Sequence, residues 1–193
     1  MSRSLITPNI GLMPEIKKVS PLVRVMARYG VLSGVIGIIA VIIFFYIGKH
    51  PFWIFPLFDP RVLLIAIFLV FGLKEIRDYF QGGILFFWQG LAGSLVLLAV
   101  MSVTGYIGIL IFGSLEPEFV KMYITQGLEQ INNIPADSAD EIGKSAIEEV
   151  RKTIHETSVS WMAKRYAVQT YLFGFFIAVI ISVVLRRQPK SDL

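Results

Sequence analysis

Four long runs of apolar residues alternate with polar stretches along the chain. A helix needs about 20 mostly apolar residues to cross the hydrocarbon core of a bilayer. On this basis the pattern predicts spans over residues 29–48, 60–80, 84–112 and 166–185. The turns between them are short, except for a polar stretch over residues 113–165. The sequence therefore predicts an all-α, polytopic membrane protein with four transmembrane helices.

The second span is the shortest in apolar length. Only about twelve apolar residues follow Arg61, so its helix crosses only if it includes the charged residues before Phe80. Asp59 and Pro60 form a favourable helix start, because Asp caps exposed N–H groups and Pro suits the first helical position. An alternative span that begins at Phe52 contains two prolines and Asp59, and is therefore less favourable.

The third apolar run, from Ile84 to Phe112, has 29 uncharged residues. This exceeds a perpendicular crossing, so its helix is expected to tilt, to kink near Gly105 and Gly108, or to extend beyond the bilayer. Polar residues within the spans, such as Gln89, are expected to bond to nearby backbone rather than to line a pore. No acidic or basic residue is expected at mid-membrane depth, which argues against an ion- or proton-coupled transporter.

The polar stretch 113–165 is predicted to form a helical hairpin outside the membrane. Residues 116–133 favour one helix, with Pro117 at its start, and Ser138 and Glu141 form a capping box for a second. Apolar or small residues then recur every four positions and predict a helix that runs straight into the fourth span: Ile142, Ala146, Val150, Ile154, Ser158 and Met162. The hairpin is expected to bury these stripes against itself or the bilayer surface; the alternative is a face for a protein partner.

Composition and charge support a membrane location. The chain is 55% hydrophobic and 17% charged, whereas soluble domains carry about 25% charged residues. Its positive charge flanks the apolar runs rather than forming one basic face, so no nucleic-acid partner is expected. The basic lead (1–28), the turn after the second span and the chain after Leu185, which ends in the short polar tail (189–193), share ten Lys and Arg. By the positive-inside rule, both termini of the 29–188 membrane domain are expected in the cytoplasm of a bacterial inner membrane.

No reactive constellation is evident. The chain has no cysteine, its two histidines lie far apart, and the common nucleophile, phosphate-binding and paired-histidine motifs are absent. We therefore expect no catalytic residue, cofactor or metal, and no enzymatic activity. The leading hypothesis is an accessory or scaffold protein that acts through its hairpin and its helix faces, with a protein partner or as a homo-oligomer. The alternative is a small transporter or channel.

Two groups of residues are candidates for specific roles. The first is a charged turn between the second and third spans, with the residues that follow it: Lys74, Glu75, Arg77, Asp78, Gly82, Gly83 and Gln89. It is expected to end the second helix at the cytoplasmic interface, with a weak Lys74–Asp78 pair, and a functional role stays open. The second group consists of small residues spaced for close helix packing: Gly30, Gly34, Gly37, Gly174, Ala178 and Ser182.

The chain also resembles a known family. The resemblance rests on a basic turn followed by two glycines, an aromatic residue and a glutamine, and on a later acidic-Pro-Glu-Phe stretch. The matching residues are Lys74, Arg77, Asp78, Gly82, Gly83, Phe87 and Gln89, and then Glu116, Pro117, Glu118 and Phe119. These features resemble small bacterial inner-membrane proteins grouped as a domain of unknown function, numbered forty-one ninety-nine. The resemblance covers nearly the whole chain and implies a four-helix membrane domain with no assigned activity, substrate or cofactor.

Overall fold

The protein is described here from a computed structural model, which describes residues 20–54, 59–134 and 144–188. Within these ranges the chain is all-α. Its helices are α1 (Pro21–Tyr46), α2 (Pro60–Glu75), α3 (Phe87–Leu115), α4 (Glu118–Asn132), α6 (Lys144–Thr153) and α7 (Val159–Leu185). Three short turns are also helical: η1 (Pro51–Trp53), η3 (Ile76–Phe80) and η4 (Ile154–Glu156).

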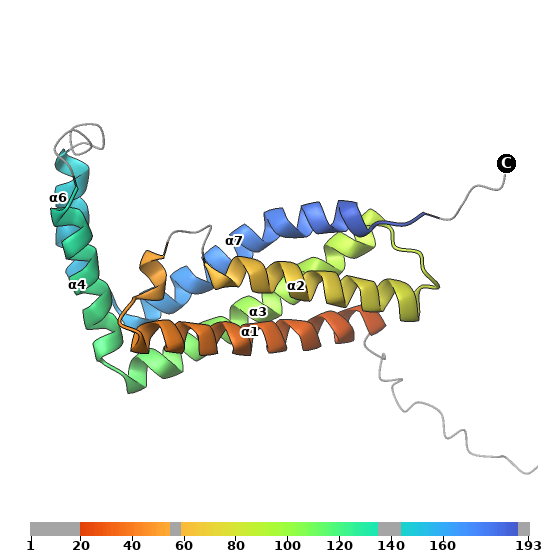
Figure 1. Ribbon diagram of the computed structural model, residues 1–193, viewed down its shortest axis with the longest axis horizontal. Helices are drawn as coiled ribbons and strands as arrows, with labels where there is room; N and C mark the ends of the chain where they lie inside the picture. Colours follow the sequence, from red (N-terminus) through yellow and green to blue (C-terminus); the bar gives the residue numbers. More distant parts are fainter. Residues whose placement is uncertain (1–19, 55–58, 135–143, 189–193) are drawn as a thin grey trace, which may run out of the picture.

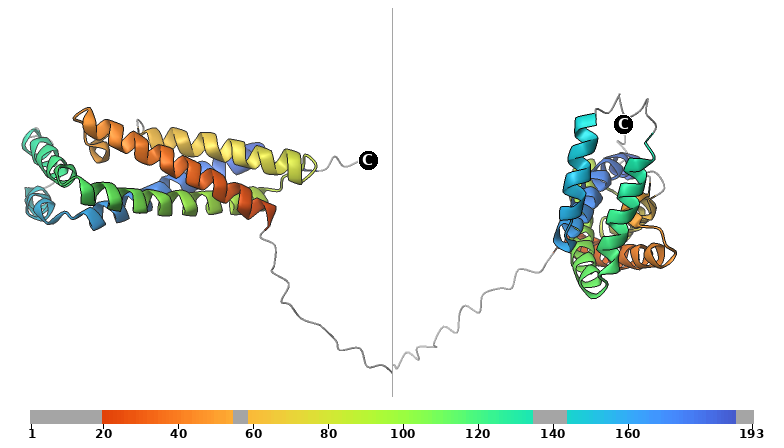
Figure 2. Two further views of the ribbon diagram at one scale, coloured as in Figure 1. Left: turned by 90° about the horizontal axis from the view of Figure 1, so that it is seen from below. Right: turned by 90° about the vertical axis from the view of Figure 1, so that its left-hand side faces the viewer.

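Four of these helices, α1, α2, α3 and α7, run side by side along the long axis of the molecule (Figure 1). Both α1 and α7 pack against α2 and against α3. Contacts at successive glycines show that α1 and α3 run in the same direction and that α7 runs opposite to them. Helices α4 and α6 lie side by side across one end of this bundle (Figure 2). We call this the hairpin end, and the opposite end, where α2 leads into α3, the turn end.

Helix α1 begins eight residues before the predicted span. Ser20 caps it by accepting a hydrogen bond from the Val23 N–H, and Pro21 occupies the first turn. Arg24 and Arg28 therefore lie on this helix, at its exposed end. The first 19 residues of the predicted lead lie outside the described residues.

Helix α2 confirms the predicted helical stretch 60–80, because α2 continues directly into the π-helical turn η3. Asp59 caps α2 as expected, with its Oδ1 accepting the Arg61 N–H at 2.9 Å. Beyond η3, Gly82 and Gly83 both adopt positive φ angles, which favour glycine, and the chain reverses into α3.

Helix α3 is uninterrupted from Phe87 to Leu115 and begins three residues after the predicted start. A kink near Gly105 and Gly108, one of the three alternatives, does not interrupt the helix: Gly105 packs against the ring of Tyr166 and Gly108 against Ile38. The helix also continues three residues past Phe112.

The hairpin differs from the prediction at its return. Helix α6 does not run into α7; it ends in η4, the chain is extended at Thr157, and Ser158 caps α7 through the Trp161 N–H. Of the predicted stripe, Ile154 and Met162 are buried, whereas Ala146 and Val150 are exposed. Ile142 and the predicted capping box lie outside the described residues.

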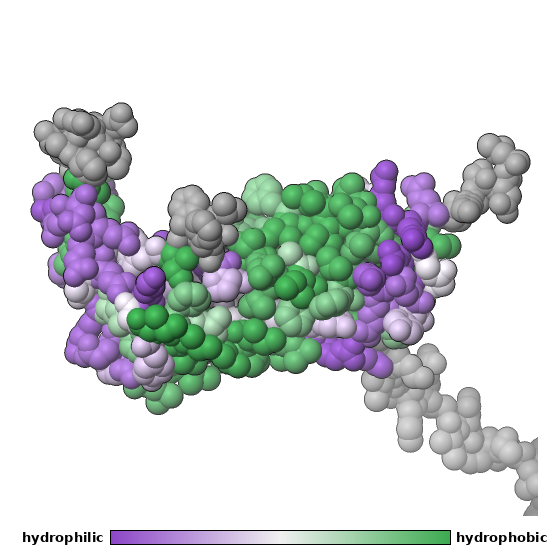
Figure 3. All heavy atoms as spheres, viewed as in Figure 1, coloured by the Kyte–Doolittle hydropathy of each residue, from purple (hydrophilic) through white to green (hydrophobic). Residues whose placement is uncertain are grey.

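The surface is that of a membrane protein. On the face shown in Figure 3, an apolar band covers the middle of the bundle, with hydrophilic residues at both ends. Helices α1, α3 and α7 are long and apolar enough to cross a membrane. Helix α2 has only 16 residues, fewer than a crossing needs, so a fourth span does not follow from helix length alone.

The buried core has two halves. At the turn end it consists mainly of aliphatic side chains from α1, α2 and α3, such as Met26, Leu69 and Leu97. At the hairpin end it is aromatic, with Phe45, Phe52, Phe119, Tyr123 and Tyr166 among its members. This second half joins η1 and α4 to the bundle, so the hairpin is anchored in the core rather than linked to it by flexible chain.

Candidate functional site

The predicted charged turn lies at the end of α2 and is tied to α1. Glu75 accepts hydrogen bonds from Arg28 Nη2 at 2.8 Å and from the Tyr29 hydroxyl at 2.7 Å. Asp78 pairs with the adjacent Arg77, whose Nε lies 2.7 Å from Asp78 Oδ1. The predicted partner was Lys74 instead. Glu75 thus joins α2 to α1, while the Arg77–Asp78 pair lies within the last helical turn itself.

Three of the predicted residues, Lys74, Glu75 and Asp78, line one open groove of about 620 Å³ together with Tyr29 and other aromatic residues. Gly82, Gly83 and Gln89 are not among its lining residues. Gln89 is the third residue of α3, where its Oε1 accepts the Phe86 N–H at 3.3 Å. It therefore caps a helix, in agreement with the expected backbone bond.

The same end holds a link that the sequence did not suggest. Leu85, just before α3, and Arg187, just after α7, form an antiparallel β-bridge. Their N–H groups donate to each other's carbonyl oxygens at 3.0 and 2.8 Å. The start of α3 and the end of α7 are therefore joined through backbone, next to the charged turn.

The predicted small residues lie in helix contacts. A β-carbon on Gly30 would lie 2.8 Å from the Leu97 carbonyl oxygen, and one on Gly34 would lie 2.7 Å from Thr104 Cβ. On α7, Gly174 packs against Leu98, and Ser182 lies against Gly90 of α3. The seams α1–α3 and α3–α7 therefore depend on the missing or small side chains at these positions.

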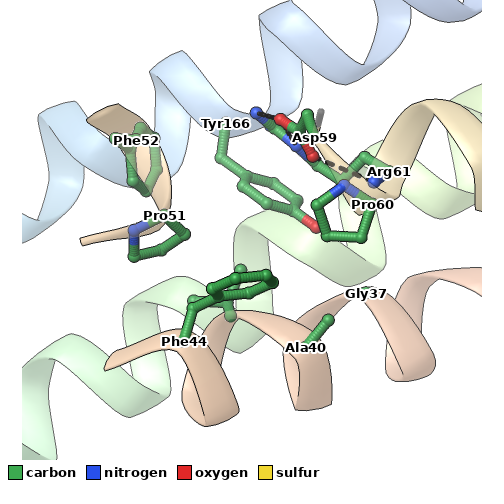
Figure 4. Close-up of a pocket in the computed structure, with 10 residues that line it drawn as sticks. Gly37, Ala40, Phe44, Pro51, Phe52, Asp59, Pro60, Arg61 and Tyr166 are labelled. Carbon is green, nitrogen blue, oxygen red and sulfur yellow. Dashed lines mark hydrogen bonds and ion pairs between the residues drawn. The ribbon is translucent and has the colours of Figure 1, made fainter. Parts of the chain in front are cut away.

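A buried ion pair at the start of α2 was missed by the sequence analysis. Asp59 and Arg61 are both buried, and Arg61 Nε donates to Asp59 Oδ2 at 2.7 Å. Arg61 Nη2 donates to the same oxygen. The guanidinium also lies over the ring of Tyr166 on α7, 4.5 Å from its centroid (Figure 4). Stacking and pairing together satisfy much of a charge that is costly to bury.

The position of this pair along the bundle bears on the expectation that no acidic or basic residue lies at mid-membrane depth. Asp59, Pro60 and Arg61 line the same small cavity as Gly37 of α1. Gly37 is nine residues before the end of α1 at Tyr46, or about 14 Å along a helix axis. The pair thus lies well below the hairpin end.

Two cavities flank Arg61. The first, with a volume of about 10 Å³, lies beside Tyr166 and the apolar face of α1, and has room for about one water molecule. The second, with a volume of about 240 Å³, lies between η1 and α7 and is also lined by Arg165 and Gln169. Arg61 Nη1 and the Tyr166 hydroxyl are buried and have no hydrogen-bond partner among the residues described. Polar groups are therefore available for a ligand here.

No group of three or more potential metal ligands occurs in the part of the chain that the structure describes. The acidic side chains near the bundle are used in pairs with arginines, and the buried His50 packs among aromatic rings and caps η1. These residues form ion pairs and caps rather than a ligand set.

The chain matches a model of a known protein family. A model described as "Protein of unknown function (DUF4199)" matches residues 28–187. The chain belongs to this family. The comparisons with curated proteins and with solved structures found no match.

The region matched by the DUF4199 family model extends from Arg28 to Arg187. It therefore includes the Arg28–Glu75 pair, the Asp59–Arg61 pair and the Leu85–Arg187 bridge. The one local signal for the buried pair was an Asp and an Arg two residues apart at the start of a short apolar run. Sequence reasoning assigned both to an interfacial turn.

Proposed function

We propose that this chain is a four-span protein of the bacterial cytoplasmic membrane, with α2 as its second span. Helix α2 and η3 together contain 21 consecutive helical residues, enough for most of a crossing. Toward the hairpin end, the buried turn η1 packs against α4, with Trp53 Nε1 donating to the Tyr123 carbonyl oxygen at 3.0 Å. Irregular backbone is tolerated at membrane depth where protein covers it in this way. The start of α1 and the end of α7 then share one side.

The orientation follows from charge. The turn end carries Arg24, Arg28, Lys74, Arg77, Arg186 and Arg187 against Glu75 and Asp78. The positive-inside rule favours this end in the cytoplasm. Both termini are then cytoplasmic, and the α4–α6 hairpin is extracytoplasmic.

Within this frame the protein acts as a non-enzymatic accessory or scaffold protein that binds a protein partner through its hairpin. One observation carries this proposal: two apolar side chains of α6, those of Ala146 and Val150, are left exposed. Val150 is 49% exposed and Ala146 is also exposed, although α6 lies beyond the apolar band. Val150 borders a groove of about 390 Å³ between α6 and α7, together with Trp161. Uncovered apolar groups beside a concave surface are typical of interaction sites.

The test uses a photo-crosslinking amino acid at position 150 in native membranes, with position 149 as the matched control. We expect a single stoichiometric adduct from position 150, lost when Ala146→Glu is added. Equal labelling from both positions, or none from position 150, would contradict the proposal. Substitution is preferable to deletion of the hairpin, because Phe119 and Tyr123 of α4 belong to the core.

The second candidate function is a small transporter or channel, as a single chain or as an oligomer, and the buried Asp59–Arg61 pair favours it. Charges inside a membrane domain often mark a substrate or ion path. Purified protein in liposomes distinguishes the two candidates. Solute flux that occurs without any partner and is lost in Asp59→Asn supports transport. Absence of flux, together with an adduct from position 150, supports the scaffold role.

A further inference from the structure

The cavity between η1 and α7 has a polar end and an apolar end. Its volume is about 240 Å³. Arg61, Arg165 and Gln169 supply side-chain donors, while Phe52, Ile54 and Phe173 supply apolar surface. A cavity of this composition suits a ligand with a charged group joined to hydrocarbon.

The positive charge at the polar end exceeds the negative charge. Both oxygens of Asp59 are already used, Oδ1 by the Arg61 N–H and Oδ2 by the Arg61 guanidinium. The side chain of Arg61 is only 10% exposed, and its Nη1 has no partner in the described chain. One buried guanidinium therefore has hydrogen-bonding capacity left over.

Arg165 adds the excess charge. Its Nη1 donates to the Tyr123 hydroxyl at 2.7 Å, and its guanidinium lies 5.3 Å from the Trp161 ring centroid. It also borders the neighbouring groove with Glu156, but among the ion pairs of the described residues none includes Arg165. Nearby His50 adds no charge at neutral pH, because burial lowers its pKa to about 3. A half-buried cation without a carboxylate partner is unfavourable unless an anion is bound.

The direction of α7 relates the two ends to the membrane. Arg165, Gln169 and Phe173 follow one another at four-residue intervals, so they lie on one face of the helix. This face passes from the hairpin end toward the middle of the apolar band. Leu172 and Phe176, which are also exposed, lie beside Phe173 and extend its hydrocarbon surface. Along α7, Arg165 is thus nearest the hairpin end, and Phe173 lies nearer the middle of the apolar band.

We propose that this cavity binds the phosphate group of a membrane phospholipid, held by Arg61 and Arg165 with Gln169 as a further donor. Arginine forms strong, often bidentate hydrogen bonds with phosphate oxygens. The acyl chains lie along Phe173 and the exposed apolar face of α7. The phosphate balances the charge of Arg165 and lies beside the Arg61 guanidinium, which also lines the cavity.

The experiment measures phosphatidylglycerol bound to the purified full-length protein by native mass spectrometry. Arg165→Gln and Gln169→Leu are each expected to weaken binding, the former by about tenfold or more, since one charge-assisted contact is lost. Two controls match the first variant. Tyr123→Phe removes the other hydrogen bond of Arg165, and Lys164→Gln removes an adjacent exposed charge; both should bind like the wild type.

Two further ligands test whether the bound phosphate group belongs to a lipid or is a free anion. Diacylglycerol, which lacks the phosphate, should bind at least about tenfold more weakly than phosphatidylglycerol. Inorganic phosphate alone should not displace the lipid at equal concentration, because it lacks the acyl contacts. Unchanged lipid binding in both Arg165→Gln and Gln169→Leu would overturn the proposal. A protein that binds inorganic phosphate but does not bind phosphatidylglycerol would also overturn the proposal. That result would assign the cavity to a soluble anion. Circular dichroism checks folding, and Gln169→Leu still tests the site if Arg165→Gln does not fold.

Discussion

At the scale of single residues, Tyr166 joins more of the molecule than any prediction from sequence suggested. Its ring lies beneath the Arg61 guanidinium, packs against Gly105 of α3, and is 6.1 Å from the Phe52 ring by centroids. A β-carbon on Gly37 of α1 would be 2.9 Å from its hydroxyl. One large side chain thus fills a space made by two glycines and contacts three helices and η1.

The buried pair should behave as a unit when mutated. Asp59→Asn keeps an acceptor for the cap but leaves Arg61 as an uncompensated buried charge, and is expected to cost about 3–5 kcal/mol. The double variant Asp59→Asn/Arg61→Met should cost clearly less, because no charge is left buried. Reversible unfolding in detergent micelles measures both. Additive costs, with the double variant the least stable, would show that the two side chains do not interact.

A pH effect is expected from His50. Its folded pKa of about 3 lies below the usual value of 6.5 because the ring is buried. The unfolded chain therefore binds a proton that the folded chain does not as pH falls below 6.5. The contribution of His50 to the free energy of unfolding is therefore complete above that pH. It falls by about 1.4 kcal/mol per pH unit as the pH is lowered from about 6.5 to about 3.

Unfolding measured across that pH range tests the effect, with His50→Asn as the comparison. Asn retains an acceptor for the Phe52 N–H, which His50 Nδ1 accepts at 3.3 Å. The variant should lose the steep part of the pH dependence. A wild type and variant with parallel pH profiles would mean that His50 is not the responsible group.

At the scale of helices, stability depends on the close seam between α1 and α3. Gly30→Val should destabilise the bundle by about 1–3 kcal/mol, because the side chain meets the Leu97 carbonyl oxygen, which belongs to a helix backbone and moves little. Ala99→Val is the matched control, since Ala99 is exposed on α3. Thermal unfolding in micelles should separate the two variants; an equal loss in both would rule out seam packing as the cause.

How far sequence predicts the helices depends on whether the signals are local. Asp59-Pro60 and Gly82-Gly83 act through their own backbone, and the stretch between them was predicted correctly. Ser20-Pro21 is an equally local signal for the start of α1, but the charges of Arg24 and Arg28 were taken as the limit of the helix. Ser158 is likewise a good N-cap, yet the four-residue apolar repeat obscured it and suggested one continuous helix.

The candidate site was less predictable, because it depends on contacts across the chain. The turn residues were recognised, but not that Glu75 would bind Arg28 and Tyr29 of α1. Arg61 was considered only as the residue that precedes the short apolar run of the second span. Its burial depends on Tyr166, about a hundred residues later, and on the glycines that admit that ring. Spacing along one segment carries no information of this kind.

At the scale of the whole molecule, the proposed topology makes a direct prediction. Reporter fusions after Gln81, at the turn end, should read cytoplasmic, and fusions after Asn133, at the end of α4, should read extracytoplasmic. A fusion after Gln188 is the matched control for the first, because the end of α7 lies beside the start of α3 through the Leu85–Arg187 bridge. Opposite readings from Gln81 and Gln188 would mean that α3 and α7 do not both cross the membrane, and reversal of all three would overturn the orientation.

The short α2 also has a consequence for biogenesis. A translocon would meet a segment of 16 helical residues that opens with Asp59 and Arg61, and each such charge costs about 2.5–3.5 kcal/mol at the centre of an inserting helix. The side chain that covers the pair, Tyr166, is synthesised about a hundred residues later. We therefore expect α2 to remain near the translocon or the membrane surface until α7 emerges. Assembly is then completed late, and a nascent chain truncated before α7 would be a substrate for membrane quality-control proteases.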